Sequence, residues 1–360
     1  EGQAPIPANM ITIPKLLKEA GYTTGMFGKW GLGAPGSSGD PVNQGWDEFF
    51  GYNCQRQAHT FYPKHLWHND NKVMLDGKVY SHDLIQKQAL KFIRDNAKKP
   101  FFAYLPITIP HAAMQCPEED VAPFRKKFPQ FEDKIGKYSH GTKVRNPVAA
   151  FAGMMTRMDR GVGQVLDLLD ELKIADNTLV LFTSDNGPHN EGGHQPGFFN
   201  SNGPLRGHKR DLYEGGIRVP LIAYWPGRVK AGSVSDHICA HWDLMPTFCE
   251  LAKISTPKHT DGISYIPALT GGKQKKHDYL YWEFHSYGNA QAIRMGDWKA
   301  IRLNVKNDPD APIQLYNLKQ DIGETKNIAA THPNVVKQIA PLFKEAHTPS
   351  ERFPLFAKKR

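Results

Sequence analysis

The stretch of sequence that decides the fold is Leu179-Val180-Leu181-Phe182-Thr183-Ser184-Asp185-Asn186-Gly187-Pro188-His189. Its first four residues are apolar and rich in β formers, which predicts a buried strand. The strand runs into an Asp-Asn-Gly-Pro turn, which places a carboxylate beside a carboxamide. Because ligands of open α/β sheets bind beyond the carboxyl ends of strands, this turn is a candidate site for Ca²⁺ or Mg²⁺. An Asx-turn that only closes the strand is the alternative.

The composition is that of a globular protein with an excess of positive charge. The chain has 360 residues, of which 40% are hydrophobic and 22% charged, and its formal net charge is +9. Such an excess favours anionic partners, for example sulfated or phosphorylated substrates. The sequence contains no nucleic-acid-binding motif, no apolar segment of membrane length and no recognisable signal peptide. We therefore expect neither a nucleic acid nor a membrane as partner.

The order of the predicted elements indicates an α/β protein followed by a smaller unit. Strands are predicted over 22–28, 100–105, 179–182 and 219–226, and helices over 12–20, 81–96, 147–172 and 241–251. This alternation predicts a mostly parallel central sheet sandwiched by helices. Residues 34–70, rich in Gly and Pro, are interpreted as a long surface excursion. Four strands without intervening helices and one helix follow, so we expect an α/β domain over 1–272 and a C-terminal antiparallel sheet plus helix over 273–360.

Chemically active side chains lie at or just after the predicted strand ends. They are Lys29, His111, the pair Asp185 and Asn186, and Lys209. Because the ends of parallel strands meet at one edge of a sheet, we expect these groups to share a pocket. Two ammonium groups, an imidazole and a metal-binding turn can hold a tetrahedral oxyanion and protonate a leaving oxygen. Each residue alone would be an ordinary surface or loop residue, so the hypothesis depends on their convergence.

Several motifs around these positions resemble those of the sulfatase family, within the alkaline phosphatase superfamily. The similar segments are GMFGKWGLG (25–33), SDNG (184–187), PLRGHK with YEGGIRVP (204–220) and WDLMPT (242–247). The resemblance runs from about residue 12 to residue 345. It implies a sulfuric ester hydrolase, similar to arylsulfatases, that acts on a sulfated carbohydrate or an aryl sulfate in the periplasm or outside the cell.

The resemblance also implies roles for the matching residues. Asp185 and Asn186 would be two ligands of Ca²⁺, Lys29 and Lys209 would contact the sulfate and the nucleophile, and His111 would protonate the leaving alcohol. In the family the nucleophile is the hydrate of formylglycine, a modified Cys or Ser. The metal and the lysines would stabilise charge on the sulfuryl oxygens.

The chain departs from the family pattern at the nucleophile. Both the Cys/Ser-x-Pro-x-Arg motif and the Asp-Asp pair that ends the family's first strand are absent. In the family both lie upstream of the point where this chain starts, so we expect about a hundred N-terminal residues to be missing, judged from typical domain size. Since Ca²⁺ takes about six to eight oxygens, we expect this chain to bind it weakly and to be inactive. A true pseudoenzyme is the alternative.

A second departure is Gly31, where many family members have a histidine that helps to break down the sulfated intermediate. His59, His189 and His194 are candidates for that role, with substrate contact or a plain surface position as alternatives. Substrate contacts are expected from the loops 53–62 and 190–194 and from 282–285, which mix aromatic and hydrogen-bonding groups. The candidate substrate-binding residues are Arg56, His59, His189, His194 and His285.

Two other functions compete with sulfate ester hydrolysis. A phosphodiesterase or phosphonate hydrolase of the same superfamily would act on an ester of the same tetrahedral shape and a different charge. A non-catalytic protein that binds polyanions would explain both the net charge of +9 and the absent nucleophile.

Overall fold

The central sheet of the protein has five strands in the order β4-β3-β2-β1-β5. In the computed structural model, which describes residues 3–357, these are β1 (Thr23–Lys29), β2 (Glu48–Tyr52), β3 (His65–His68), β4 (Asn71–Met74) and β5 (Phe101–Tyr104). Strand β1 pairs in parallel with both β2 and β5, whereas β3 and β4 join antiparallel. The sheet is therefore mixed, and its parallel part is β2-β1-β5.

The prediction that 34–70 is a surface excursion is wrong, because this segment supplies β2 and β3 of the central sheet. Phe50 and Tyr52 of β2 are buried against Phe27 of β1, and this apolar burial outweighs the surrounding Gly and Pro. The two strands approach closely where a glycine of each faces the other. A Cβ on Gly51 would lie 1.9 Å from the carbonyl oxygen of Gly28, so only glycine fits there.

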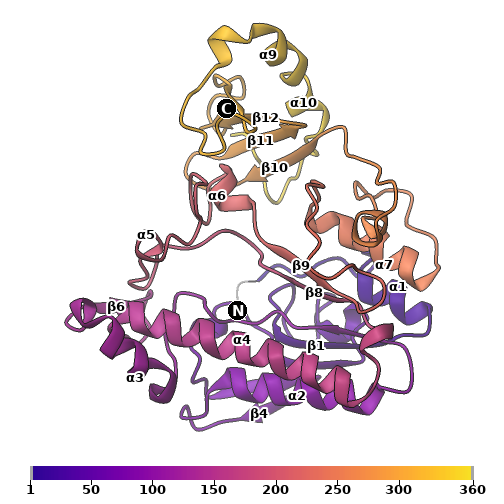
Figure 1. Cartoon of the computed structure of the whole chain (residues 1–360), viewed down its shortest axis with the longest axis vertical. Coiled ribbons are helices and arrows are strands. Elements are labelled where there is room, and N and C mark those ends of the chain that lie inside the picture. The colour runs from indigo at the N-terminus through magenta and orange to yellow at the C-terminus, as the bar shows by residue number, and fades with distance from the viewer. Residues whose placement is uncertain (1–2, 358–360) are drawn as a thin grey trace.

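Helices pack on this sheet and on one another. The α-helices are α1 (Ile13–Glu19), α2 (Ser81–Asn96), α3 (Glu118–Lys127), α4 (Pro147–Glu171), α5 (Pro196–Phe199), α6 (Glu214–Ile217), α7 (Leu244–Ala252), α8 (Ile266–Thr270), α9 (Pro333–Ile339) and α10 (Leu342–Glu345). Figure 1 shows α2 and α4 side by side, and α2 buries Ile85, Ala89 and Phe92 against the sheet. No helix among the described residues is long and apolar enough to cross a membrane.

Strands β8 (Val180–Thr183) and β9 (Leu221–Tyr224) form where strands were predicted, but they pair with each other antiparallel rather than within a parallel sheet. Val180 shares an apolar cluster with Phe101 and Ala103 of β5, so the pair lies next to that strand. Among residues 3–357, β5 pairs only with β1 and β8 only with β9, so each of these two strands has one edge without a partner strand. This explains why β8, predicted to be buried, is only half-buried.

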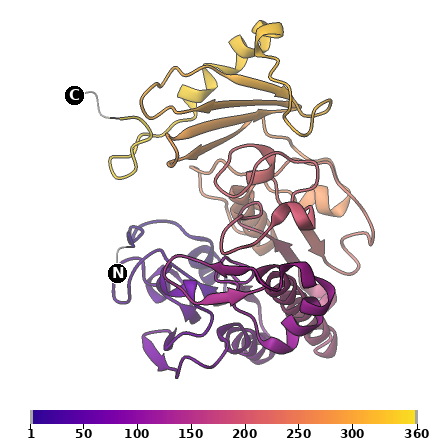
Figure 2. The ribbon, with the colours of Figure 1, turned by 90° about the vertical axis from the view of Figure 1, so that its left-hand side faces the viewer.

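The C-terminal sheet is antiparallel, as predicted, and its strands have the order β10-β11-β12-β13. Its strands are β10 (Leu280–Phe284), β11 (Ala290–Met295), β12 (Trp298–Leu303) and β13 (Gln314–Asn317). The expected final helix is divided into α9 and α10 at Pro341, which lacks the N–H that a continuous helix needs. Figures 1 and 2 show this sheet at one end of the molecule, with α6 next to β10 in Figure 1.

Candidate functional site

Three of the predicted positions converge beyond the ends of β1 and β5. Lys29 is the last residue of β1, and His111 follows β5 after a turn at Pro110. Lys209 comes from the loop that precedes α6, and its Nζ lies 3.2 Å from Nε2 of His111. Because an ammonium group has only donors, Nε2 is the acceptor in this contact and the imidazole is neutral. We call Lys29, His111 and Lys209 the cationic cluster.

Burial and positive charge together keep His111 neutral. Burial lowers the pKa of His111 most, and the charges of Lys209 and Lys29 lower it further, to about 2. The pKa of Lys29 is also lowered, mainly by burial and then by Lys209, while Asp185 opposes the shift. An oxyanion placed among these groups would offset their mutual repulsion.

Asp185 and Asn186 lie in the turn after β8, as predicted, and the carboxylate of Asp185 is within electrostatic range of Lys29. Its charge favours the protonated form of Lys29, and it adds to the effect of burial in raising the pKa of Tyr104. Within the turn, Asn186 Nδ2 donates to Asp185 Oδ1 at 2.6 Å. His241 contacts the backbone just after β8, since its Nε2 lies 3.0 Å from the carbonyl oxygen of Ser184.

These two side chains do not by themselves fit Ca²⁺. The ion takes about six to eight oxygen ligands, and one oxygen of Asp185 already accepts the amide of Asn186. Across residues 3–357, no group of three or more His, Cys, Asp or Glu side chains is arranged to hold a metal ion. No chemical step is therefore assigned to a metal.

Of the three histidines considered as substitutes for the one absent at Gly31, His59 lies nearest to His111. Its ring stacks on that of His111 with centroids 5.1 Å apart and planes at 3°. Burial, Lys29 and Lys209 all lower its pKa. His189 lies 6.1 Å from His111 by ring centroids, and its Nε2 is 3.1 Å from the carbonyl oxygen of Pro110. His194 instead stacks on Phe151 at 3.7 Å, as a buried packing residue would.

The structure does not bring the remaining two candidates into contact with the cationic cluster. Arg56 is exposed at the start of the 3₁₀ turn Gln57–His59. His285 is exposed at the end of β10, where its Nε2 lies 3.6 Å from Glu283 Oε2. A substrate contact of either residue stays a prediction.

Sequence reasoning missed a hairpin that reaches the cluster. It consists of β6 (Ile135–Lys137) and β7 (Lys143–Arg145), and Tyr138 follows β6 directly. The ring of Tyr138 meets that of His59 edge-on at 5.0 Å and that of His111 at 5.3 Å. Ser139 and Gly141 are the turn-forming residues between two strands of only three residues, and this pattern is too weak to predict a hairpin.

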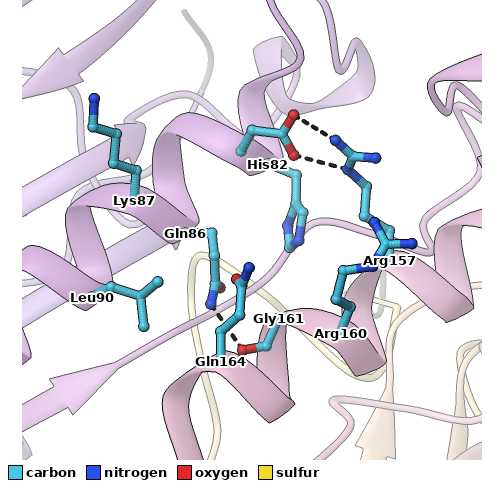
Figure 3. Close-up of a pocket in the computed structure, with 9 residues that line it drawn as sticks. His82, Gln86, Lys87, Leu90, Arg157, Arg160, Gly161 and Gln164 are labelled. Carbon is cyan, nitrogen blue, oxygen red and sulfur yellow. Dashed lines mark hydrogen bonds and ion pairs between the residues drawn. The ribbon is translucent and has the colours of Figure 1, made fainter. Parts of the chain in front are cut away.

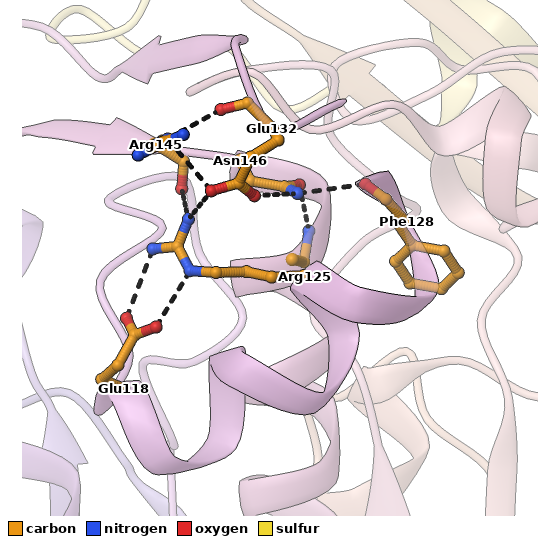
Figure 4. A network of polar contacts seen from close by, with 7 residues as sticks. Glu118, Arg125, Phe128, Glu132, Arg145 and Asn146 are labelled. Atoms are coloured by element: carbon orange, nitrogen blue, oxygen red, sulfur yellow. Dashed lines mark hydrogen bonds and ion pairs between the residues drawn. The ribbon is translucent and has the colours of Figure 1, made fainter. Parts of the chain in front are cut away.

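A network of charges holds the base of this hairpin against α3 and α4 (Figure 4). Arg125 of α3 donates to Glu118 and Glu132, and Arg145 of β7 pairs with Glu132 at 3.0 Å. Asn146 caps α4 by accepting from Ala149 N, and its amide donates to Glu132 Oε2. These contacts fix the direction in which the hairpin leaves the helices.

The loop that carries Lys209 is held by the C-terminal sheet. The guanidinium of Arg206 lies 3.9 Å from the ring centroid of Tyr213 and donates to the carbonyl oxygen of Glu324 at 2.8 Å. Glu214 of α6 is buried and pairs with Lys299 of β12 at 2.7 Å. The second sheet therefore positions a residue of the cationic cluster.

A cavity of about 360 Å³ between α2 and α4 is separate from the cluster (Figure 3). Two of its charged residues are paired with each other, since Arg157 donates to Asp83 at 2.7 Å, and Arg157 also donates to Asp120. Gln86 donates to the carbonyl oxygen of Gly161 at 2.8 Å, which links the two helices. These contacts serve helix packing, and we assign no chemistry to the cavity.

Comparison with known proteins identifies the family. The sequence matches the sulfatase family model over residues 2–254. It also matches the model of the N-sulphoglucosamine sulphohydrolase C-terminal region over residues 207–348. The chain therefore belongs to the sulfatase family, which confirms the resemblance found in its motifs.

Similar proteins are found in animals and bacteria. The chain is 31% identical to N-acetylgalactosamine-6-sulfatase of Canis lupus familiaris over 97% of its own length and 65% of the relative. It is 25% identical to N-acetylgalactosamine-6-O-sulfatase of Bacteroides thetaiotaomicron over 94% of the chain and 77% of the relative. The crystal structure of Ps i-CgsB in complex with k-i-k-neocarrahexaose matches with a TM-score of 0.80 and 30% identity, over 96% of this chain and 76% of that one. The chain thus spans about two thirds of the length of the mammalian relative.

Proposed function

We propose that the protein is a sulfuric ester hydrolase that removes sulfate from a sulfated carbohydrate or an aryl sulfate. The observation that carries this proposal is the contact of 3.2 Å between Lys209 Nζ and His111 Nε2, with Lys29 within electrostatic range of both. The chain also belongs to the sulfatase family. The relatives named N-acetylgalactosamine-6-sulfatase favour a carbohydrate as substrate.

The cationic cluster supplies two parts of the reaction. Lys29 and Lys209 would bind the sulfuryl oxygens and stabilise the negative charge that develops on them. The bound anion would in turn weaken the effect of both lysines on His111 and raise the pKa of its imidazole. His111 could then carry the proton that the leaving oxygen needs.

The sequence contains neither the family's Cys/Ser-x-Pro-x-Arg motif nor its Asp-Asp pair. We propose that the whole gene product uses a formylglycine nucleophile, because that is the family's reacting group. Asp185 and Asn186 would be two of the Ca²⁺ ligands. We further propose the division into domains at residue 272 and a location in the periplasm or outside the cell.

Replacement of Lys209 tests the proposed activity. The product of the whole gene, assayed with 4-nitrophenyl sulfate and Ca²⁺, should lose about 10²–10³-fold in kcat upon Lys209→Ala, the scale of one lost oxyanion contact. Lys98→Ala is the matched control, because Lys98 is an exposed lysine after α2. Full turnover in Lys209→Ala would refute the assignment. Equal or faster turnover of 4-nitrophenyl phosphate by the wild type would favour the phosphate-ester alternative.

A further inference from the structure

The loop over residues 187–194 lies between the two segments that carry His111 and Lys209, and the proposed sulfate chemistry gives it no role. The loop packs tightly against the turn that carries His111. A Cβ on Gly192 would lie 2.1 Å from the carbonyl oxygen of Ala112, the residue after His111. Only glycine permits this approach, so the sequence itself keeps the loop close to that turn.

Two contacts join the same loop to Lys209. The backbone N–H of Lys209 donates to the carbonyl oxygen of Pro188 at 2.9 Å. The next residue, Arg210, pairs through its Nη2 with Oε1 of Glu191 at 2.7 Å. The loop therefore holds the backbone at Lys209 itself and at its neighbour.

His189 joins the loop to the turn before His111. Its ring is buried, its Nδ1 accepts from the backbone N–H of Glu191 at 3.2 Å, and its Nε2 lies 3.1 Å from the carbonyl oxygen of Pro110. A backbone N–H only donates and a carbonyl oxygen only accepts. One form of the ring satisfies both contacts, namely the neutral imidazole with its proton on Nε2. Burial lowers the pKa of His189, against the effect of the hydrogen bond with Pro110, and so favours this neutral form.

The ring of His111 has few contacts that would orient it. Its Nδ1 is buried and has no hydrogen-bond partner among residues 3–357. Its Nε2 contacts Lys209, and its face stacks on the ring of His59. Where the ring lies relative to Lys209 therefore depends on the backbone at Pro110, and His189 holds the carbonyl group of that residue.

We propose that His189 is a positioning residue that, by holding the carbonyl group of Pro110, keeps His111 at the place relative to Lys209 from which it can protonate the leaving oxygen. The inference rests on the proposed function and adds a residue to it. Both ring nitrogens of His189 are engaged by backbone groups, which leaves neither for a substrate or for the sulfated intermediate. A displacement of about 1 Å at a reacting group can cost about 10²-fold in rate, so a residue that never touches the substrate can still matter.

The form of the His189 ring is tested on the 360-residue chain, without turnover. Nitrogen NMR of protein labelled at its histidine rings distinguishes the two neutral tautomers from the imidazolium, and the signals absent from His189→Phe identify His189. At pH 7 we expect a neutral ring with its proton on Nε2. A proton on Nδ1 instead, or on both nitrogens, would overturn the proposal.

Kinetics of the whole gene product test the effect on His111. The ratio kcat/KM covers the steps up to departure of the leaving group. Proton donation matters more for phenyl sulfate than for 4-nitrophenyl sulfate, because phenol is the more basic leaving group. His189→Phe keeps a ring of similar size but removes both hydrogen bonds, so kcat/KM should fall about 10- to 100-fold for phenyl sulfate and less for 4-nitrophenyl sulfate. An equal loss for the two esters would indicate a merely structural role and refute the proposal.

Two amide variants separate the two hydrogen bonds of the ring. Glutamine places an amide N–H about where Nε2 of the imidazole lies, so His189→Gln should recover most of the activity on phenyl sulfate. Asparagine reaches only to about the position of Nδ1, keeps the contact with Glu191 and loses that with Pro110. His189→Asn should therefore be as impaired as His189→Phe, and equal activity of the two amide variants would contradict the proposed role of Pro110.

His194→Phe is the matched control. It makes the same substitution in the same loop, but both ring nitrogens of His194 lack a hydrogen-bond partner among the described residues. It should keep the kcat/KM of the wild type with both esters, and a loss as large as that of His189→Phe would refute the proposal. The thermal unfolding midpoint of each variant shows that folded proteins are being compared.

The outcomes separate this inference from the proposed activity. If the wild type hydrolyses both esters and His189→Phe does so with unchanged kcat/KM, the positioning role is refuted and the proposed function stands. If the wild type hydrolyses neither ester, the proposed function is refuted and the positioning role with it. A loss confined mainly to phenyl sulfate, recovered in His189→Gln, supports both.

Discussion

At the scale of single residues, the chemistry of the cationic cluster comes from a conflict between burial and charge. The fold brings Lys29, His111 and Lys209 together although the two lysines repel each other. Both lysines also lower the pKa of His111 and so keep it neutral. Such an arrangement costs stability in the absence of an anion, and it is typical of functional sites. An anion that binds there should therefore stabilise the protein, and its binding should depend on pH.

Sulfate binding should weaken as the pH rises. The pKa of Lys29 lies below its ordinary value, and a bound anion would raise both this pKa and that of His111. The bound state therefore takes up protons, so affinity is greater on the acid side. The gain in unfolding temperature from sodium sulfate, relative to sodium chloride of equal ionic strength, should be larger at pH 6 than at pH 9. A gain that is the same at both pH values would contradict this.

Ca²⁺ should bind this chain weakly. Asp185 and Asn186 offer few oxygens, and the described residues hold no larger ligand group. We expect a dissociation constant of about 1 mM or weaker, which is the weak end of protein Ca²⁺ sites. Titration calorimetry measures it, and Asp185→Asn should abolish what binding there is. Micromolar affinity would mean that a complete site exists after all.

At the scale of elements, the sequence predicted strands and helices with strong periodicity and missed those that depend on tertiary contacts. Helix α4 was predicted within one residue, because its apolar positions recur at helical spacing. Strand β2 was missed because a stretch with so much Gly and Pro reads as a loop, and only contact with Phe27 shows otherwise.

The candidate site could be predicted to a similar degree. The cationic cluster follows from the positions of strand ends, which the sequence shows. Tyr138 could not be predicted, because the hairpin that brings it to the cluster has two strands of only three residues and no distinctive local pattern. The cationic cluster was thus visible in the sequence, and the tyrosine that packs against it was not.

Replacement of Asn146, at the base of the β6–β7 hairpin, should destabilise the protein. Asn146→Ala removes the cap of α4 and the amide donated to Glu132, and leaves alanine at a φ of 48°. We expect a loss of about 1–3 kcal/mol in the free energy of unfolding, from the cap and the backbone together. Urea unfolding measures it, and Asn146→Gly should lose less because glycine accepts this φ. Equal losses in both variants would exclude backbone strain as a cause.

At the scale of the whole molecule, the C-terminal sheet supports the loop that carries Lys209. Lys299 is completely buried and pairs with Glu214, which follows Lys209 by five residues. Although burial opposes it, Lys299 and Arg294 hold the pKa of Glu214 below its ordinary value. A second carboxylate, Glu324, is buried beside Glu214, so the contact between the loop and the sheet includes a group that changes charge near neutral pH.

Glu324 should make this contact dependent on pH. Burial raises its pKa to about 7, and the charge of Glu214 adds to the shift, while Lys299 opposes it. Because the pKa in the folded state lies above that of the unfolded chain, its contribution to stability is fully present below about pH 4.5 and is lost as the pH rises through about 7. The unfolding temperature should therefore fall between pH 6 and pH 8 in the wild type and fall less in Glu324→Gln, which is neutral throughout. Scanning calorimetry at these pH values decides it, since parallel pH profiles of the two proteins would show that another group is responsible.

If the difference is found, loosening of the C-terminal sheet above neutral pH would also displace Lys209. Hydrolysis by the whole gene product should therefore decline over the same pH range in the wild type before it does in Glu324→Gln.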